Sequence, residues 1–123
     1  MTETVYGSTD IAKEWCTIKS TITIYDTNFD NWNIQASRDV DNEIVIQVAK
    51  IRNNTTLPLL PFEPEAIPSA IQDATTARMC AMYFLSRQRP DMYKTWLGQS
   101  DDSISKYMSS LTFKRKIFGR VHS

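Results

Sequence analysis

Residues 57–68 read Leu57-Pro-Leu-Leu-Pro-Phe-Glu-Pro-Glu-Ala-Ile-Pro68, and residues 69–89 continue as Ser69-Ala-Ile-Gln-Asp-Ala-Thr-Thr-Ala-Arg-Met-Cys-Ala-Met-Tyr-Phe-Leu-Ser-Arg-Gln-Arg89. The first run holds four prolines within eleven positions. Each proline fixes φ and removes an amide donor, which excludes a regular helix or a central strand there. In the second run small and apolar residues recur at helical spacing: Ile67, Ala70, Ile71, Ala74, Ala77, Ala81, Phe84 and Leu85. We therefore predict a proline-rich joint and then a core helix, whose small residues allow another helix to approach closely.

Charge and proline mark the start of this core helix. The acids Glu63 and Glu65 suit the positive end of a helix, and Pro64 or Pro68 fits its first turn. The helix is therefore expected to begin near Glu63 or Glu65.

Two further helical segments are expected after the core helix. Pro90 ends the core helix and is the first residue of the next, which should reach Gly98. Residues 99–103 predict a break or a kink, after which helical spacing resumes over residues 104–111. Residues 112–123 form a basic C-terminal arm, of a kind that is often disordered alone and ordered on binding.

The N-terminal half predicts two helices on either side of an ambiguous stretch. Residues 8–16 predict a short helix, with its Ser-Thr-Asp start supplying the N-cap. Residues 17–25 alternate β-branched and polar residues, which fits an extended stretch that is either a short strand or a loop. From about Phe29 to Asn53 the apolar spacing predicts a helix of about 20 residues, roughly 30 Å long.

These elements define an all-α protein: a small bundle of about four helices with a long proline-rich joint and an extended C-terminal arm. The helical domain is expected over residues 1–111 and the arm over residues 112–123. No apolar run approaches the roughly 18 residues that cross a membrane. The N-terminus has neither the basic nor the apolar region of a secretory signal, so we expect a soluble protein that is made or assembled inside a cell, without membrane contact.

The net charge is zero, but it is unevenly distributed along the chain. Residues 1–73 hold 11 acids and 5 bases, whereas residues 74–123 hold 3 acids and 9 bases. Such a chain can stack against copies of itself or bind an acidic partner. A solvated tail without a partner and contact with nucleic acid are the alternatives, although four tail charges are few for strong phosphate binding.

Residues that carry catalytic or metal chemistry are few and scattered. A zinc site needs about four Cys, His or acidic ligands at short spacings, and the chain has two cysteines and one histidine. Cys16 and Cys80 are expected as buried reduced thiols rather than a disulfide. A nucleophilic pair of Cys80 with His122 would require the terminus to fold back onto an apolar helix face. Three glycines leave no phosphate-binding loop. We expect no enzyme, no cofactor and no metal.

Arginine and aromatic residues are the candidates for contacts with partners, because these residue types dominate interface energetics. Arg78, Arg87 and Arg89 are candidates for contacts between subunits. Arg78 interrupts an otherwise apolar helix, and it fits a surface arginine as well as an interface residue or a buried ion pair. The three tryptophans are expected mainly as core or inter-helix anchors.

Two stretches share their pattern with a known family. The first is Asp10-Ile-Ala-Lys-Glu-Trp-Cys-Thr-Ile18, a loop, and Phe29-Asp-Asn-Trp-Asn-Ile-Gln-Ala-Ser-Arg-Asp-Val-Asp-Asn-Glu-Ile44; the second is the proline-rich joint with Ala70-Ile-Gln-Asp-Ala-Thr-Thr-Ala-Arg-Met-Cys-Ala-Met-Tyr-Phe-Leu-Ser-Arg87. They resemble the head–tail connector proteins of tailed bacteriophages, also called adaptor or head-completion proteins. The likeness lies in a short capped helix, a long helix with Ala-Ser near its start, and a core helix after prolines. It spans most of residues 10–97 and departs from the family at residues 17–25 and in the longer joint.

The resemblance implies a virion protein of the neck, assembled in the host cytoplasm. Copies would form a ring, dodecameric in the family, docked on the portal protein and next to a tail or stopper protein, with DNA passing through the lumen unread. The C-terminal arm would bind the portal through basic residues and apolar anchors: Phe113, Lys114, Arg115, Lys116, Ile117, Phe118 and Arg120. The alternative function is a small helical DNA-binding regulator that uses Arg87, Arg89 and the basic tail. Zero net charge and the lack of a helix-turn-helix turn weigh against it.

Overall fold

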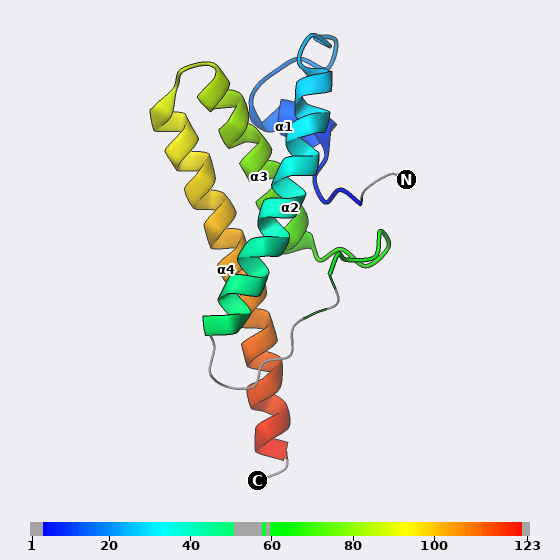
Figure 1. The fold of residues 1–123 in the computed structure, drawn as a ribbon, viewed down its shortest axis with the longest axis vertical. Helices are drawn as coiled ribbons and strands as arrows, with labels where there is room; N and C mark the ends of the chain where they lie inside the picture. The colour runs from blue at the N-terminus through cyan, green and yellow to red at the C-terminus, as the bar shows by residue number, and fades with distance from the viewer. Residues whose placement is uncertain (1–3, 51–57, 59, 122–123) are drawn as a thin grey trace.

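A computed structural model of the chain describes residues 4–50, 58 and 60–121, and for residues 112–121 it describes the backbone alone. The described residues form four helices: α1 (Thr9–Trp15), α2 (Asp26–Lys50), α3 (Ser69–Ser86) and α4 (Pro90–Val121) (Figure 1). No strand occurs among these residues. The prediction of a small all-α bundle of about four helices is therefore confirmed.

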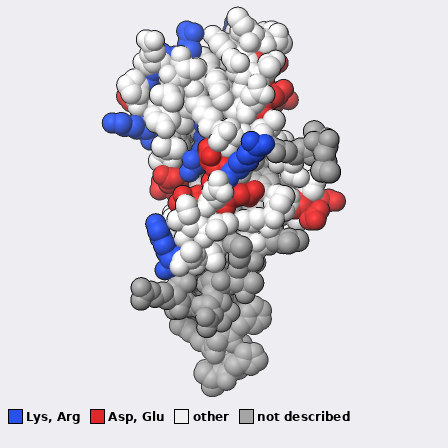
Figure 2. Space-filling view, in the orientation of Figure 1, with Lys and Arg blue, Asp and Glu red and all other residues white. Residues whose placement is uncertain are grey.

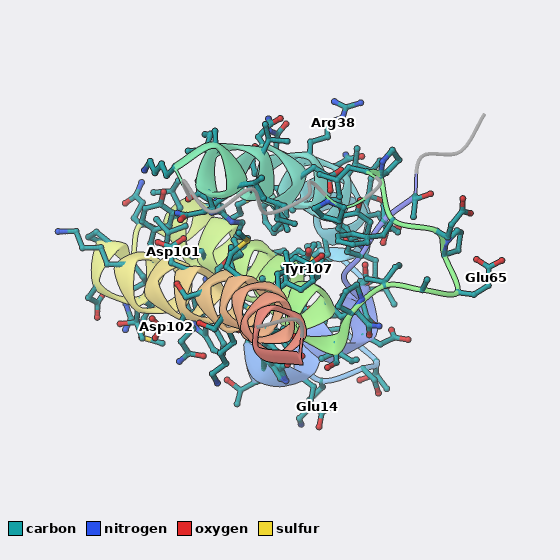
Figure 3. The ribbon with its side chains drawn as sticks, turned by 90° about the horizontal axis from the view of Figure 1, so that it is seen from below. Glu14, Arg38, Glu65, Asp101, Asp102 and Tyr107 are labelled. Atoms are coloured by element: carbon teal, nitrogen blue, oxygen red, sulfur yellow. The ribbon has the colours of Figure 1, made fainter. Side chains whose placement is uncertain are left out.

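The helix α3 is the central element of the bundle. It contacts each of the other three helices, and the view along the long axis places it between α2 and α4 (Figure 3). α3 and α4 form an antiparallel pair joined by the three residues 87–89. α4 then continues past the ends of α2 and α3, so that its last turns project from the body (Figure 1).

Small side chains line the buried face of α3. Ala74, Ala77 and Ala81 are at most 2% exposed, so little side-chain volume separates α3 from its neighbours. The Ser100 hydroxyl of α4 uses this space to donate a hydrogen bond to the Ala74 carbonyl oxygen at 2.8 Å. The small-residue stripe predicted from the sequence is thus a buried face.

The hydrophobic core has two parts, one towards each end of the body. One part joins α2, α3, α4, the N-terminal segment and the joint through Tyr6, Val40, Ile44, Phe62, Ile71, Ala74, Ile104, Tyr107 and Met108. The other joins α1, α2 and α3 through Ala12, Cys16, Phe29, Ala36, Met79 and Cys80. Around the second part Trp15 stacks on Trp96 at 5.7 Å between ring centroids, and Trp32 meets Phe29 edge-on at 5.1 Å. Trp15 and Trp96 therefore anchor a contact between α1 and α4, and Trp32 packs against the core beside Phe29 of its own helix, as predicted for core and inter-helix anchors.

Three polar side chains, one helical turn apart on α2, hold the segment before α1. Asn33 accepts a hydrogen bond from the Gly7 N–H and donates one to the Gly7 carbonyl oxygen, both at 3.0 Å. The Ser37 hydroxyl accepts from the Tyr6 N–H at 3.0 Å, and the Tyr6 hydroxyl donates to Asp41 at 2.8 Å. Tyr6 and Gly7 lie outside any helix, so these side chains of α2 supply the hydrogen-bond partners that their backbone groups need. We call residues 6–7 the N-terminal strap.

The Tyr6 hydroxyl also fixes the proline-rich joint. It accepts a hydrogen bond from the Phe62 N–H at 3.0 Å, and the two rings meet edge-on at 5.6 Å. Burial and the bond to Asp41 raise the pKa of Tyr6. Burial also raises the pKa of Asp41, while the hydrogen bond from Tyr6 opposes this rise. One side chain thus joins the N-terminal segment, α2 and the joint.

The start of the core helix differs from the prediction. α3 begins at Ser69 with Pro68 as its N-cap, rather than near Glu63 or Glu65. A helix begun at Glu63 would carry Pro68 in its interior, where proline removes a hydrogen bond and its ring clashes with the preceding turn. The residue before a proline also avoids helical backbone angles, which ends any earlier helix before Pro68.

Of the break or kink predicted over residues 99–103, the break is wrong, because α4 is continuous there. Ser100 bonds to α3, Asp101 pairs with Arg78 of α3 at 3.3 Å, and Ile104 is 2% exposed. These tertiary contacts outweigh the weak local preference of Gly, Ser and Asp against a helix. The arm predicted from residue 112 continues the same helix as far as Val121, and residues 122–123 lie outside the described residues.

Residues 17–25 are a series of turns, not a strand. Cys16 caps α1, Thr17 has a φ of 59°, and turn hydrogen bonds join Ile22 to Lys19 and Asp26 to Thr23. The N-cap of α1 is Ser8, whose hydroxyl accepts from the Ile11 N–H at 3.3 Å, as predicted. The long helix begins at Asp26, three residues earlier than predicted, and Lys50 is its last described residue.

Candidate interaction site

The turn between α3 and α4 presents two of the predicted arginines together. The Arg87 N–H bonds to the carbonyl oxygens of Tyr83 and Phe84 at 3.1 and 3.2 Å, and the Arg89 N–H bonds to Phe84 at 2.9 Å. Gln88 between them has a φ of 59°, which reverses the chain before Pro90 starts α4. The backbone bonds therefore fix the positions at which Arg87 and Arg89, both exposed, leave the turn.

Aromatic side chains from the residue before α2, from α2 and from α3 support this turn. The Arg87 guanidinium donates to the Tyr25 hydroxyl at 3.4 Å, and the Tyr25 ring meets the Tyr83 ring edge-on at 5.4 Å. Tyr83 in turn stacks on the buried ring of Phe29 at 5.6 Å. Burial and the neighbouring Tyr25 raise the pKa of Tyr83, whereas the Arg87 charge acts to lower it. The aromatic contacts thus connect the turn to the core.

Arg89 is held more loosely than Arg87. Its Nε donates to Asp91 at 3.5 Å, and both side chains are more than half exposed. Hydrogen bonds from Arg89 and from the Met92 backbone N–H lower the pKa of Asp91. Exposed ion pairs of this kind contribute little to stability, so Arg89 can exchange Asp91 for a partner at small cost.

Two exposed aliphatic residues stand beside members of this turn in the chain, one next to Tyr25 and one close to Arg87, and sequence reasoning missed both as interface residues. Ile24, which precedes Tyr25, is 76% exposed, and Leu85, two residues before Arg87, is 54% exposed. Arginine, tyrosine and exposed apolar side chains together are typical of protein interfaces. We call Ile24, Tyr25, Leu85, Arg87 and Arg89 the arginine end. For Ile24, the sequence did carry a signal of exposure: isoleucine alternates with polar residues over residues 17–25, and no partner strand was found for that stretch.

The structure does not bring Arg78 to the arginine end. Nine residues separate it from Arg87 on α3, which is roughly 13 Å along a helix. Its guanidinium pairs with Asp101 of α4 at 3.3 Å, and its side chain is only 15% exposed. Its Nε is buried without a hydrogen-bond partner. Arg78 therefore forms an ion pair that joins α3 to α4. A contact between Arg78 and another subunit remains a prediction.

The residues predicted to bind a portal lie at the other end of the molecule. Phe113, Lys114, Arg115, Lys116, Ile117, Phe118 and Arg120 all belong to the last part of α4, whose side chains lie outside the description. Along a helix, the 31 residues from Arg89 to Arg120 correspond to about 46 Å. The two predicted interaction surfaces are thus separate.

Acidic residues occupy the region between these two surfaces. Figure 2 shows acidic side chains gathered across the middle of the face that it presents. Asp101 and Asp102 lie on α4, and Glu65 on the joint points away from the body, whereas Tyr107 lies against the body (Figure 3). Burial raises the pKa of Tyr107. In the sequence, the bases of residues 114–120 follow Asp101 and Asp102 along α4.

A pocket of about 450 Å³ opens beside α1, lined by Asp10, Lys13, Glu14, Ile18 and Ser20. Lys13 is 3% exposed, and its ammonium donates to Asp26 at 2.9 Å and to the Ser20 carbonyl oxygen at 3.3 Å. These bonds join α1 to the start of α2 and order the turns between them. The lysine therefore has a structural role here.

Among the described residues, no three or more His, Cys, Asp or Glu side chains are grouped so as to hold a metal ion. Cys16 and Cys80 are free and buried, whereas His122 lies outside the description, so the pair of Cys80 with His122 cannot be placed. None of the helices in the described part of the chain is long and apolar enough to span a membrane.

Comparison of the chain with protein-family models, with curated proteins and with solved structures gives no match.

Proposed function

We propose that the chain is a structural head–tail connector protein of a tailed virus, which forms a ring under the portal and links the DNA-filled head to the tail. The pattern over residues 10–97 supports this proposal by its resemblance to such connectors. The observation that carries it is the course of α4, a 32-residue helix whose last turns project from the body (Figure 1). This course of α4 supports a contact between residues 112–121 and a partner.

The free end of α4 is the proposed portal contact. It holds Lys114, Arg115, Lys116 and Arg120, and no acid follows Asp102. Four positive charges attract an acidic surface and speed association with it. Phe113, Ile117 and Phe118 supply apolar anchors, of the kind that amphipathic helices insert into grooves. The ten residues 112–121 span about 15 Å as a helix.

The arginine end is the proposed contact between neighbouring copies. Arg87 and Arg89 leave a turn that backbone hydrogen bonds hold in place, so little backbone freedom is lost on binding. Arg78 would take part only if a neighbour replaced Asp101 as its partner. A ring of copies made in this way would surround the DNA without reading its sequence.

The test is electron microscopy of the full chain mixed with its candidate portal protein. We expect a new ring of density below the portal. A combined Lys114→Glu, Arg115→Glu and Lys116→Glu variant should lose this ring, whereas Lys106→Glu, which reverses an exposed base of α4 within the body, should keep it. Bare portals at a saturating concentration of the wild-type chain would refute the proposal.

The same variants distinguish the alternative of a DNA-binding regulator. A regulator would bind duplex DNA with an affinity that falls steeply with salt. Loss of such binding in the triple variant, together with bare portals, would replace the connector proposal with the regulator.

A further inference from the structure

The only two cysteines of the chain meet inside the second part of the core. Cys16 caps the C-terminus of α1, and Cys80 lies in the middle of α3. Their exposed fractions are 6% and 0%. Although 64 positions separate them in the sequence, folding brings both into one apolar cluster with Ala12, Phe29 and Met79.

One backbone carbonyl joins the two residues. The Ala12 carbonyl oxygen accepts a hydrogen bond from the Cys16 N–H at 3.0 Å and from the Cys80 thiol at 3.5 Å. Both cysteines therefore hydrogen-bond the same backbone oxygen of α1. A disulfide requires the two sulfur atoms to approach to about 2 Å with Cβ atoms about 4 Å apart. Two cysteines that share one buried cluster and bond the same carbonyl oxygen are close enough for a small movement to meet this requirement.

We propose that Cys16 and Cys80 are a disulfide-forming pair, which a two-electron oxidant such as an azo compound converts into a covalent clamp between α1 and α3. The two S–H bonds break and one S–S bond forms. The two electrons and two protons pass to the N=N bond of the azo compound, which becomes a hydrazine. A thiol reductant reverses the reaction by exchange. The proposal is independent of the connector function.

The surroundings of the pair determine how fast this reaction proceeds. The hydrogen bond with Cys16, and then burial, raises the pKa of Cys80. Because the thiolate is the reactive form, the thiols of the closed protein react slowly with oxidants. Reaction therefore requires α1 to move away from α3 for a short time. α1 has seven residues and is expected to open more easily than the whole protein.

The clamp should raise thermal stability, because it closes a long loop in the unfolded chain. A disulfide that closes a loop of about 65 residues lowers the entropy of the unfolded chain and so stabilises the folded state. After allowance for strain in the folded state, we expect a rise in Tm of roughly 5–15 °C. The reduced protein should lack this increase.

The test is to incubate the folded wild-type protein with diamide. The incubation should last several times longer than hydrogen exchange of the α1 amides takes, because that exchange reports how often α1 opens. We expect a monomer lighter by about 2 Da, a linked pair of peptides containing Cys16 and Cys80, a higher Tm, and reversal by dithiothreitol. Urea below the unfolding transition should accelerate the reaction. Cys16→Ala and Cys80→Ala, each with one remaining thiol, should show no rise in Tm with diamide.

Three results would overturn the proposal. The first is that both thiols of the folded protein remain free while the urea-unfolded chain oxidises readily. The second is that cross-links form only between chains. The third is an intramolecular disulfide that leaves the Tm unchanged or lowers it, because the bond would then not clamp the folded state.

Discussion

Gly7→Ala tests how closely the N-terminal strap is packed against the body. A Cβ added at Gly7 would lie 2.7 Å from the Met79 sulfur, 3.0 Å from Asn33 Oδ1 and 3.2 Å from Thr75 Cγ2. Met79 and Thr75 are fully buried. Asn33 is held by its hydrogen bonds to both backbone groups of Gly7. None of the three neighbours can therefore move aside easily, since protein interiors are close-packed.

The magnitude follows from two opposing effects. Forcing an extra methyl group into a packed site costs about 1–3 kcal/mol. Alanine also reduces the conformational freedom of the unfolded chain, which stabilises the protein by about 0.4–1 kcal/mol. Gly7 does not have a positive φ, so backbone strain adds nothing. We expect a net loss of about 1–2 kcal/mol in the free energy of unfolding.

Gly98→Ala is the matched control in the same chain. A Cβ added at Gly98 meets nothing within 4 Å, and Gly98 lies inside α4. Alanine in place of an exposed helical glycine should stabilise the protein by about 0.5–1 kcal/mol. Urea unfolding, followed by circular dichroism and tryptophan fluorescence, should show opposite signs for the two variants. A Gly7→Ala protein as stable as the wild type would refute the close packing of the strap.

Three further predictions concern the polar contacts of Tyr6, Lys13 and Asp41. Tyr6→Phe keeps the ring but leaves the Phe62 N–H and Asp41 without their partner, and it should lower the free energy of unfolding by about 1–3 kcal/mol, measured in urea. Asp26→Asn leaves the Lys13 ammonium, 4% exposed, without its counter-charge and should cost about 2 kcal/mol, more than Lys13→Met; the reverse order would contradict a structural ion pair. Because the folded pKa of Asp41 is raised above its usual 3.8, its contribution to stability is greatest below that pH and is lost as the pH rises through the folded pKa. Relative to Asp41→Asn, the wild type should therefore lose stability in urea titrations as the pH rises above 3.8, and a constant difference would contradict the raised pKa.

Local chemistry predicted those helix ends that depend on a single residue. Pro90 starts α4 and Ser8 caps α1 because proline and serine act on the adjacent backbone. The break predicted at residues 99–103 failed for the opposite reason. Its glycine, serine and aspartate residues disfavour a helix only weakly, and the bonds that Ser100 and Asp101 make to α3 outweigh this preference. Such contacts depend on positions 23 and 26 residues away and have no local signal.

The candidate site was predictable in the same partial way. Arg87 and Arg89 were identified because arginine is a residue type that dominates interface energetics. Tyr25, which supports Arg87, lies 62 positions away, and only the packing of α2 against α3 brings the two together. Ile24 was assigned to an extended stretch because β-branched residues favour strands. Its exposure depends on the turns that replace that stretch, which alternating residue types do not predict.

The order in which the chain folds should follow from the N-terminal strap. The α3–α4 pair is joined by three residues and closes with little loss of chain entropy. The strap instead makes bonds to residues 26 to 56 positions away, and such distant contacts generally form late. We therefore expect α3 and α4 to pair first, and the strap and α1 to dock last and to open first. In native-state hydrogen exchange the amides of Tyr6 and Gly7 should then exchange through local opening, while those of α3 exchange only with the whole molecule.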